Sequence, residues 1–155
     1  MSIRLVDAPP NRKLIIGDGM GEVRVKVKLT NSADDELAAT GAIPPSRVRT
    51  LNAEAIVDTG AIRCVIPQSL LEQLGVRIRG KEVAHLADGR AETVPRTASI
   101  VFDIMGRETS DEALVLGDEV LIGQTVLEKL DLLVDCKNGR LVPNPDHPDY
   151  AVTRV

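Results

Sequence analysis

A chain of 155 residues with 43% hydrophobic and 27% charged residues has the size and composition of one globular domain with its own core. The net charge of −4 and the low aromatic content, limited to Phe102 and Tyr150, offer neither the charge nor the stacking surface that nucleic-acid binding needs. No apolar run is long enough to span a bilayer and the first residues lack a secretory signal, so we expect a cytoplasmic protein that binds neither nucleic acid nor membrane.

The first fifty residues predict an irregular arm, a strand and a long connection. Residues 1–19 are rich in proline, glycine and charge, which is typical of an irregular extension. Residues 22–30, "EVRVKVKLT", alternate apolar and charged side chains with the period of a half-exposed strand. Residues 31–50 begin with helix start signals and contain Pro44-Pro45, which predicts a helical turn inside the connection.

The centre of the chain predicts strands around an acidic loop and a hairpin. The strand over residues 51–57 runs into Asp58-Thr59-Gly60, and "IRCVIP" resumes as a strand before a short leucine helix. Further on, strand-like arms over residues 81–87 and 91–103 flank Asp88-Gly89-Arg90. Asp-Gly between such arms is a strong hairpin signal.

The C-terminal part predicts a further strand, a short buried strand, a short helix, a closing hairpin and an extended tail. The segment "VLIGQTVLEKL" repeats the order of strand, glycine loop and leucine helix that follows Asp58. Many short strands separated by turns favour an all-β closed barrel or sandwich with one or two short helices. These elements fall at residues 108–117, 119–123, 124–130, 131–143 and 144–155.

Asp58 needs an explanation because a carboxylate between two apolar runs is costly unless it is hydrogen-bonded, paired or used in chemistry. The simple structural alternative is a strand-end aspartate that accepts amide bonds from the following turn. The apolar context and the second hydrophobic-glycine segment, "LIG", favour a functional loop.

The cysteines and histidines give no second site. Cys64 and Cys136 lie in apolar, strand-like surroundings and are interpreted as two buried free thiols of a reducing compartment. With His85 and His147 they include metal-ligand types but lack paired spacing, so no metal is expected. Cys64 also lacks an evident histidine partner, which favours a core thiol over a nucleophile.

"IVDTGA", the helix after "VIP", the Asp-Gly hairpin and "VLIGQTVLEKLDLLVDCKNGRLVPNP" together resemble the retropepsin-like aspartic protease family, above all its small single-domain prokaryotic members. The resemblance spans roughly residues 20–150. It implies a closed retropepsin-like barrel that is active as a homodimer. On this basis the chain divides into three parts: an extension over residues 1–19, a protease domain over residues 20–143 and a proline-rich tail over residues 144–155.

The resemblance also assigns roles to residues. Asp58 is the expected catalytic aspartate, Thr59 bonds across the dimer, and Gly60 allows the two loops to approach. Beneath them lie Ile122 and Gly123. The expected substrate-binding residues are those after the motif and at the hairpin tip, or flap: Ala61, Arg63, Asp88, Gly89 and Arg90.

This assignment implies a specific chemistry. Two carboxylates about 3 Å apart cannot both ionise, so they share a proton and can act as general base and general acid on a peptide bond. One motif per chain suffices because a two-fold axis supplies the second aspartate. We therefore expect an aspartic endopeptidase that acts on peptide or protein substrates as a homodimer without a cofactor.

The sequence departs from the retroviral members at two positions. Those members carry acidic residues shortly after the motif and an arginine after the later glycine, whereas this chain carries Arg63 and Gln124. The hairpin "HLADGRAET" is also polar instead of glycine-rich. These departures favour the alternative hypothesis, a non-hydrolytic homodimeric module that binds extended peptides or serves as an interaction scaffold.

Overall fold

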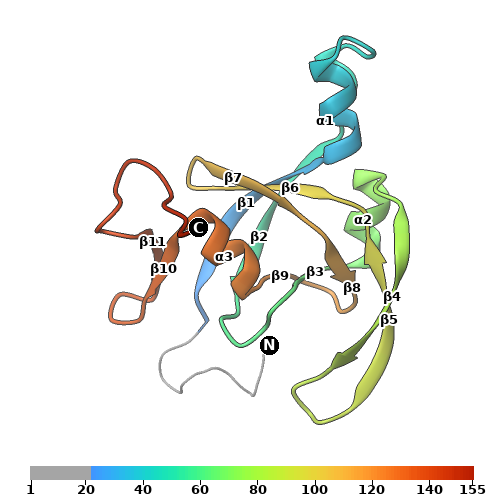
Figure 1. The fold of residues 1–155 in the computed structure, drawn as a ribbon. Helices are drawn as coiled ribbons and strands as arrows, with labels where there is room; N and C mark the ends of the chain where they lie inside the picture. The colour runs from blue at the N-terminus through green and yellow to red at the C-terminus, as the bar shows by residue number, and fades with distance from the viewer. Residues whose placement is uncertain (1–21) are drawn as a thin grey trace.

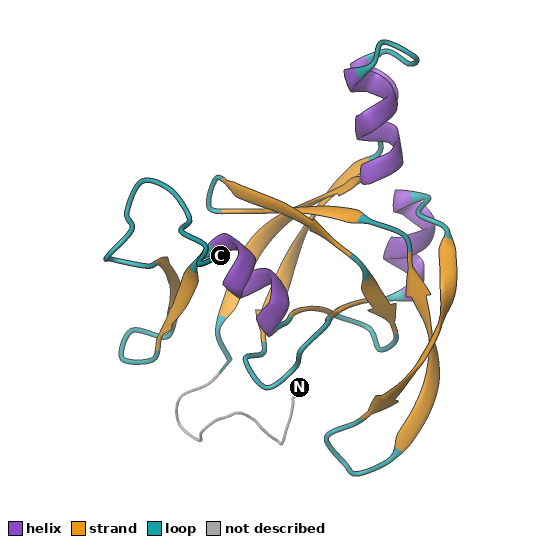
Figure 2. Ribbon diagram, in the orientation of Figure 1, coloured by secondary structure: helices purple, strands orange, loops and turns teal. Residues whose placement is uncertain are grey.

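The computed structural model describes residues 22–155, and the expected extension over residues 1–19 lies outside this range. The described part is mostly β with three short α-helices and one 3₁₀ turn (Figures 1 and 2). The strands are β1 Arg24–Asn31, β2 Thr50–Val57, β3 Cys64–Ile66, β4 Ile78–His85, β5 Ala91–Thr97, β6 Ile100–Ile104, β7 Arg107–Asp111, β8 Ala113–Val115, β9 Val120–Ile122, β10 Leu132–Asp135 and β11 Arg140–Pro143. The helices are α1 Ser32–Ala39, η1 Pro45–Arg47, α2 Gln68–Leu74 and α3 Gln124–Leu130.

Nine strands form one sheet in the order β4-β5-β8-β3-β9-β2-β1-β6-β7, and β10 and β11 form a separate hairpin. The prediction of a closed barrel is not met, because β4 and β7 lie at opposite edges of this sheet and do not pair. Both edge strands carry many charged residues, "IRGKEVAH" and "RETSD", as expected of edges that remain unpaired. The sheet is therefore open, although the mainly β composition agrees with the predicted fold class.

The local patterns explain most elements. In β1 the apolar residues point inward, with Val27 and Leu29 almost fully buried, while the alternating basic residues are exposed. Gly75 ends α2 in the left-handed conformation at φ 68°, and Asp131 ends α3 at φ 56°. The structure has one more helix than predicted, since the helical turn expected in the long connection extends over two full turns as α1.

Two other sequence predictions need correction. The second arm of the predicted hairpin breaks after β5, because Ala98 and Ser99 lie between β5 and β6 and belong to neither strand. Cys136 is exposed in the turn between β10 and β11, so the prediction of two buried thiols holds only for Cys64. The apolar residues before Cys136 belong to β10, and the thiol itself follows the end of that strand.

One continuous core lies between the sheet and the helices. α2 and α3 contribute their leucine faces to it, and Phe102 of β6 is its one aromatic side chain. Within residues 22–155 no helix is long and apolar enough to cross a membrane. The largest fully buried side chains are Phe102, Leu29, Ile66, Leu74, Ile100, Ile104, Ile122, Leu130, Val27, Val120 and Val126.

The C-terminal tail folds back onto the end of α3. The carboxylate of Asp131 accepts hydrogen bonds from the Asn144 side chain at 3.1 Å and the Val152 amide at 3.1 Å, and His147 Nδ1 lies 2.6 Å from it. The Asn144 bond is the main cause that holds the pKa of Asp131 below its ordinary value. Arg107 also donates to the His147 carbonyl at 2.7 Å. The tail is irregular, and these contacts fix its path.

The segment that connects β1 to β2 through α1 is held in place by the Asp34 carboxylate, which has little exposure to solvent. Asp34 accepts bonds from the backbone amide of Arg49 at 3.0 Å and from its side chain, from Nε at 2.8 Å and from Nη2 at 3.0 Å. The side-chain bonds from Arg49 hold the pKa of Asp34 below its ordinary value of 3.8. The ionised form is therefore the one that stabilises the fold.

We predict that Asp34→Asn lowers the free energy of unfolding at neutral pH and that the difference from wild type disappears in acid. A depressed folded-state pKa contributes stability above the unfolded pKa and loses it as the pH falls through the folded pKa. Urea midpoints measured from neutral to acid pH test this, with the exposed neighbour Asp35→Asn as control. A difference between wild type and Asp34→Asn that is the same at every pH would contradict the prediction.

Candidate active site

Parallel pairing of β2 and β9 brings the two glycine-containing segments together. Val57 is in register with Ile122, so the C-terminal ends of β2 and β9 lie next to each other. Asp58 follows β2 and Gly123 follows β9, and the Asp58 amide donates to the Ile122 carbonyl at 2.9 Å. Two segments that are far apart in the sequence thus form one site.

Residues 58–63, here called the acid loop, form a tight turn around the Asp58 carboxylate. The Gly60 amide donates to Asp58 Oδ1 at 2.9 Å, and the Ala61 amide donates to the Asp58 carbonyl at 3.2 Å. Asp58 is half-buried, whereas Thr59 and Gly60 are exposed. The turn therefore orients the carboxylate and presents the remainder of the motif at the surface.

Gly123 supports the acid loop through direct backbone contact. A Cβ at this position would lie 2.5 Å from the Arg63 carbonyl oxygen and 3.0 Å from that of Ala61. The next amides donate into the loop, from Gln124 to the Ala61 carbonyl at 2.7 Å and from Thr125 to the Ile62 carbonyl at 3.1 Å. Gly123 therefore packs against the acid loop, and its role beneath an active site stays a prediction.

The predicted flap residues lie at the tip of the β4–β5 hairpin. Gly89 has φ 89°, and the Arg90 backbone amide and side chain donate to Asp88 at 2.9 and 2.6 Å. These bonds, the backbone one first, hold the pKa of Asp88 below its ordinary value. The structure confirms the hairpin, while substrate binding by its tip stays a prediction.

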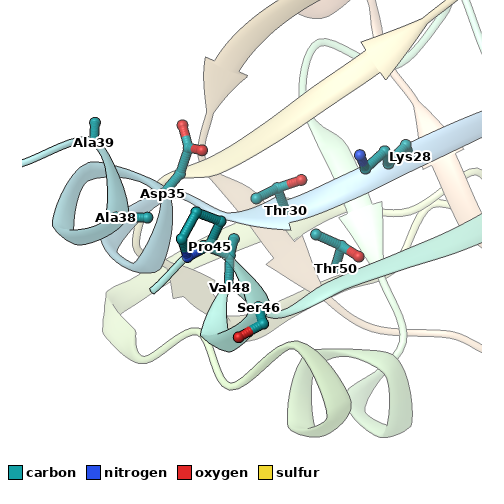
Figure 3. Close-up of a pocket in the computed structure, with 9 residues that line it drawn as sticks. All are labelled: Lys28, Thr30, Asp35, Ala38, Ala39, Pro45, Ser46, Val48 and Thr50. Carbon is teal, nitrogen blue, oxygen red and sulfur yellow. The ribbon is translucent and has the colours of Figure 1, made fainter. Parts of the chain in front are cut away.

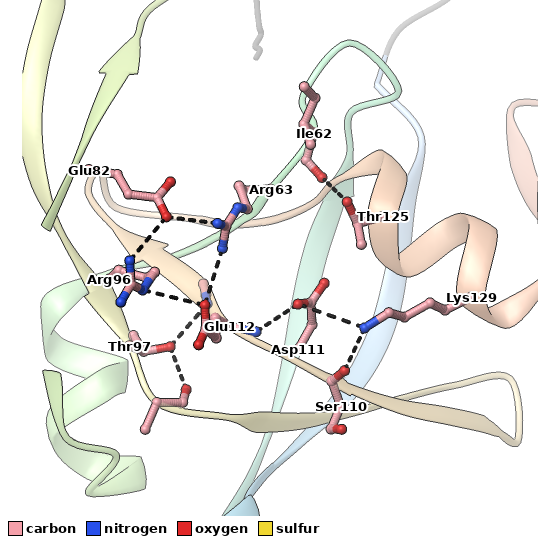
Figure 4. A network of polar contacts seen from close by, with 12 residues as sticks. Ile62, Arg63, Glu82, Arg96, Thr97, Ser110, Asp111, Glu112, Thr125 and Lys129 are labelled. Carbon is pink, nitrogen blue, oxygen red and sulfur yellow. Dashed lines mark hydrogen bonds and ion pairs between the residues drawn. The ribbon is translucent and has the colours of Figure 1, made fainter. Parts of the chain in front are cut away.

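Arg63 belongs to a group of charged side chains that sequence reasoning missed. Its guanidinium donates to Glu82 of β4 at 2.7 Å and to Glu112, before β8, at 3.5 Å. Arg96 of β5 contacts the same two carboxylates at 3.4 Å each (Figure 4). No local pattern signals this group, because its members come together only through the pairing of β4, β5, β8 and β3. The prediction that Arg63 binds substrate is not tested by these contacts.

Cys64 directly follows the acid loop and is buried, as expected of a core thiol. Burial raises the pKa of its thiol to about 12, and the Gly123 amide donates to its sulfur at 3.3 Å. The described residues also contain no group of three histidine, cysteine or acidic side chains arranged to hold a metal ion.

A separate pocket of about 610 Å³ lies between α1, η1 and the adjoining parts of β1 and β2 (Figure 3). Polar side chains, among them Lys28, Asp35 and Ser46, line much of it. None of its lining residues belongs to the acid loop or to the β4–β5 hairpin. It is therefore a different region of the surface from the candidate site.

The fold and the acid loop define a retropepsin-like domain, and comparison with known families agrees. The family model described as "gag-polyprotein putative aspartyl protease" matches residues 46–129, which is more than half of the chain. The chain belongs to this family. The matched range includes the acid loop, the β4–β5 hairpin, Gly123 and most of α3.

Among solved structures, the chain is similar to the crystal structure of the retroviral protease-like domain of Ddi1 from Leishmania major. The TM-score is 0.51 with 16% sequence identity, over 83% of this chain and 89% of that chain. At this identity the likeness shows the fold alone. No curated protein sequence matches the chain.

Proposed function

We propose that the chain is an aspartic endopeptidase in which the Asp58 carboxylates of two copies form one catalytic pair. The observation that carries the proposal is the acid loop itself. The Asp58 amide is bonded to β9, and the first two amides of α3 donate to the loop residues that follow the motif. The Asp58 carboxylate is oriented by the Gly60 amide, and Thr59 and Gly60 are exposed. An exposed, rigidly supported turn can meet the same turn of a second copy about a two-fold axis.

The reaction needs two carboxylates in different protonation states. Held close together, they share one proton because like charges raise the pKa of one member of the pair. The ionised Asp58 removes a proton from a water molecule whose oxygen attacks the peptide carbonyl carbon, and the protonated Asp58 donates to the carbonyl oxygen. Collapse of the tetrahedral intermediate, with a proton transferred to the amide nitrogen, releases a carboxylic acid and an amine.

The single Asp-Thr-Gly of this sequence supports an association of this kind. In the proposed homodimer Thr59 bonds across the axis and the β4–β5 hairpins cover an extended peptide. Ala61, Arg63 and the hairpin tip are the proposed contacts to the peptide backbone and side chains. Ile62, a residue of the acid loop that is 74% exposed, offers apolar surface to the partner copy or to the peptide.

We predict that the purified protein releases fragments from a mixed peptide library between about pH 4 and pH 7, where a carboxylate pair can hold one proton. Mass spectrometry of the products at several enzyme concentrations provides the measurement. Because two chains build one site, the specific activity should fall on dilution through the dissociation constant of the dimer. Peptides that bind but remain intact at every pH would support the non-hydrolytic module instead.

A further inference from the structure

The four charged side chains around Arg63 form a closed ring of alternating charge, here called the charge ring: Arg63, Glu82, Arg96 and Glu112. Glu82 Oε2 accepts from Arg63 Nη2 at 2.7 Å and from Arg96 Nη1 at 3.4 Å. Glu112 Oε1 lies 3.5 Å from Arg63 Nη1 and 3.4 Å from Arg96 Nε. Each arginine therefore contacts both glutamates, and the ring carries no net charge (Figure 4).

The ring is partly shielded from solvent, which distinguishes it from isolated surface ion pairs. The side chains are 28% to 37% exposed. Arg96 Nε is buried without a hydrogen-bond partner, so its 3.4 Å contact with Glu112 is an ion pair alone. Isolated exposed pairs add little, whereas the members of a network with shared partners orient and strengthen one another's contacts. Removal of one member should therefore affect the other three.

The surrounding backbone leaves room for this arrangement. Gly80 of β4 is paired with Arg96 of β5, so a side chain at Gly80 would share a face with the arginine. A Cβ at Gly80 would lie 3.0 Å from Arg96 Nη2. The absence of a side chain at Gly80 leaves space for the guanidinium, whose Nη1 donates to Glu82 Oε2 at 3.4 Å.

The members of the charge ring come from the acid loop, from both strands of the β4–β5 hairpin and from the residue before β8. Arg63 is the last residue of the acid loop, and Glu82 and Arg96 lie on the two strands of the hairpin that ends at Gly89. Glu112 precedes β8, which pairs in parallel with β3, the strand that follows the acid loop. The ring thus links the acid loop directly to both strands of the flap.

We propose that the charge ring is a positioning device that holds the β4–β5 hairpin in register with the acid loop. Arg63 acts through Glu82 and sets where the flap lies over a peptide. This consequence for peptide binding rests on the proposed peptidase function, whereas the mechanical link between loop and hairpin does not.

The link is tested by hydrogen exchange of the full-length protein followed by mass spectrometry. In Glu82→Gln and Arg63→Met, exchange should rise both in the acid loop and in the strands of the hairpin, and Arg63→Lys should restore part of the protection. Glu92→Gln, a change at an exposed residue of the same hairpin, is the matched control and should leave the acid loop unchanged. If Glu82→Gln leaves exchange in the acid loop at the wild-type level, the proposal is wrong.

Kinetics on a cleaved peptide separate positioning from a general loss of structure. Loss of positioning should raise KM about fivefold or more with a smaller change in kcat, whereas a smaller folded fraction would lower apparent kcat and leave KM unchanged. Glu82 is not among the proposed peptide contacts, so its variant isolates positioning from direct binding. An unchanged KM in Glu82→Gln would overturn the proposal. If wild type cleaves no peptide, the peptidase function fails, and the exchange measurement still decides whether the ring couples loop and hairpin.

Discussion

Asp58→Asn is expected to lower peptide hydrolysis by about 10²–10⁴-fold, the range that loss of a positioned acid or base removes from catalysis. Asparagine cannot take a proton from water or donate one to the carbonyl oxygen, so a pair of two asparagines has neither function. Stability should change little, since the side-chain oxygen of the new asparagine can still accept the Gly60 amide that now bonds to Asp58 Oδ1 at 2.9 Å. Rates of fragment release and thermal unfolding, measured side by side, provide the test.

Asp118→Asn is the matched control for this prediction. Asp118 is exposed in the turn before β9, at the opposite end of that strand from Gly123, so its carboxylate has no part in the proposed chemistry. The activity of the Asp118→Asn variant should equal that of wild type. Equal activity of Asp58→Asn and Asp118→Asn would show that any hydrolysis comes from another group.

Gly123→Ala is expected to destabilise the fold by about 1–3 kcal/mol, the usual cost of overpacking a closely packed site. The added methyl group would meet the carbonyl carbon and oxygen of Arg63, at 2.7 and 2.5 Å, and backbone cannot move aside as a flexible side chain can. Relief requires displacement of the acid loop and of the bond from the Gln124 amide to Ala61. Urea unfolding together with peptide hydrolysis should show losses of both stability and activity.

Gly60→Ala offers the stability control. The nearest atom to its new methyl group would be Asp58 Oδ1 at 3.3 Å, which belongs to a side chain, and φ of Gly60 is not in the left-handed region. Its unfolding midpoint should therefore lie much closer to that of wild type. A larger loss of stability in Gly60→Ala than in Gly123→Ala would contradict the account of the loop support.

Local sequence patterns predicted the strands and helices well because those patterns depend on neighbouring residues. The alternation in β1, the proline before α2 and the Asp-Gly of the β4–β5 hairpin each identify an element without reference to the rest of the chain. Sheet closure could not be predicted in this way. Whether β4 meets β7 depends on the curvature of nine strands, and the charged residues of both edges oppose pairing.

In the candidate site, too, only the features marked by a local sequence pattern could be predicted. The acid loop and Gly123 were found because a short motif and a second hydrophobic-glycine segment mark them, and the parallel register of Val57 with Ile122 brings them together. The partners of Arg63 could not be found, since nothing near Glu82 or Glu112 in the sequence indicates a contact with the acid loop. The arginine that departs from the retroviral pattern at this loop instead joins a charge ring with the hairpin.

The most direct test of a catalytic pair shared between two copies is a titration of wild type with Asp58→Asn at a fixed wild-type concentration. If each active site needs two Asp58 carboxylates and subunits exchange freely, mixed dimers are inactive. With the variant in about ninefold excess, activity should fall to about one tenth, the fraction of wild-type chains in the mixture. Activity that stays constant as the variant is added would show that each chain acts alone and would contradict the shared pair.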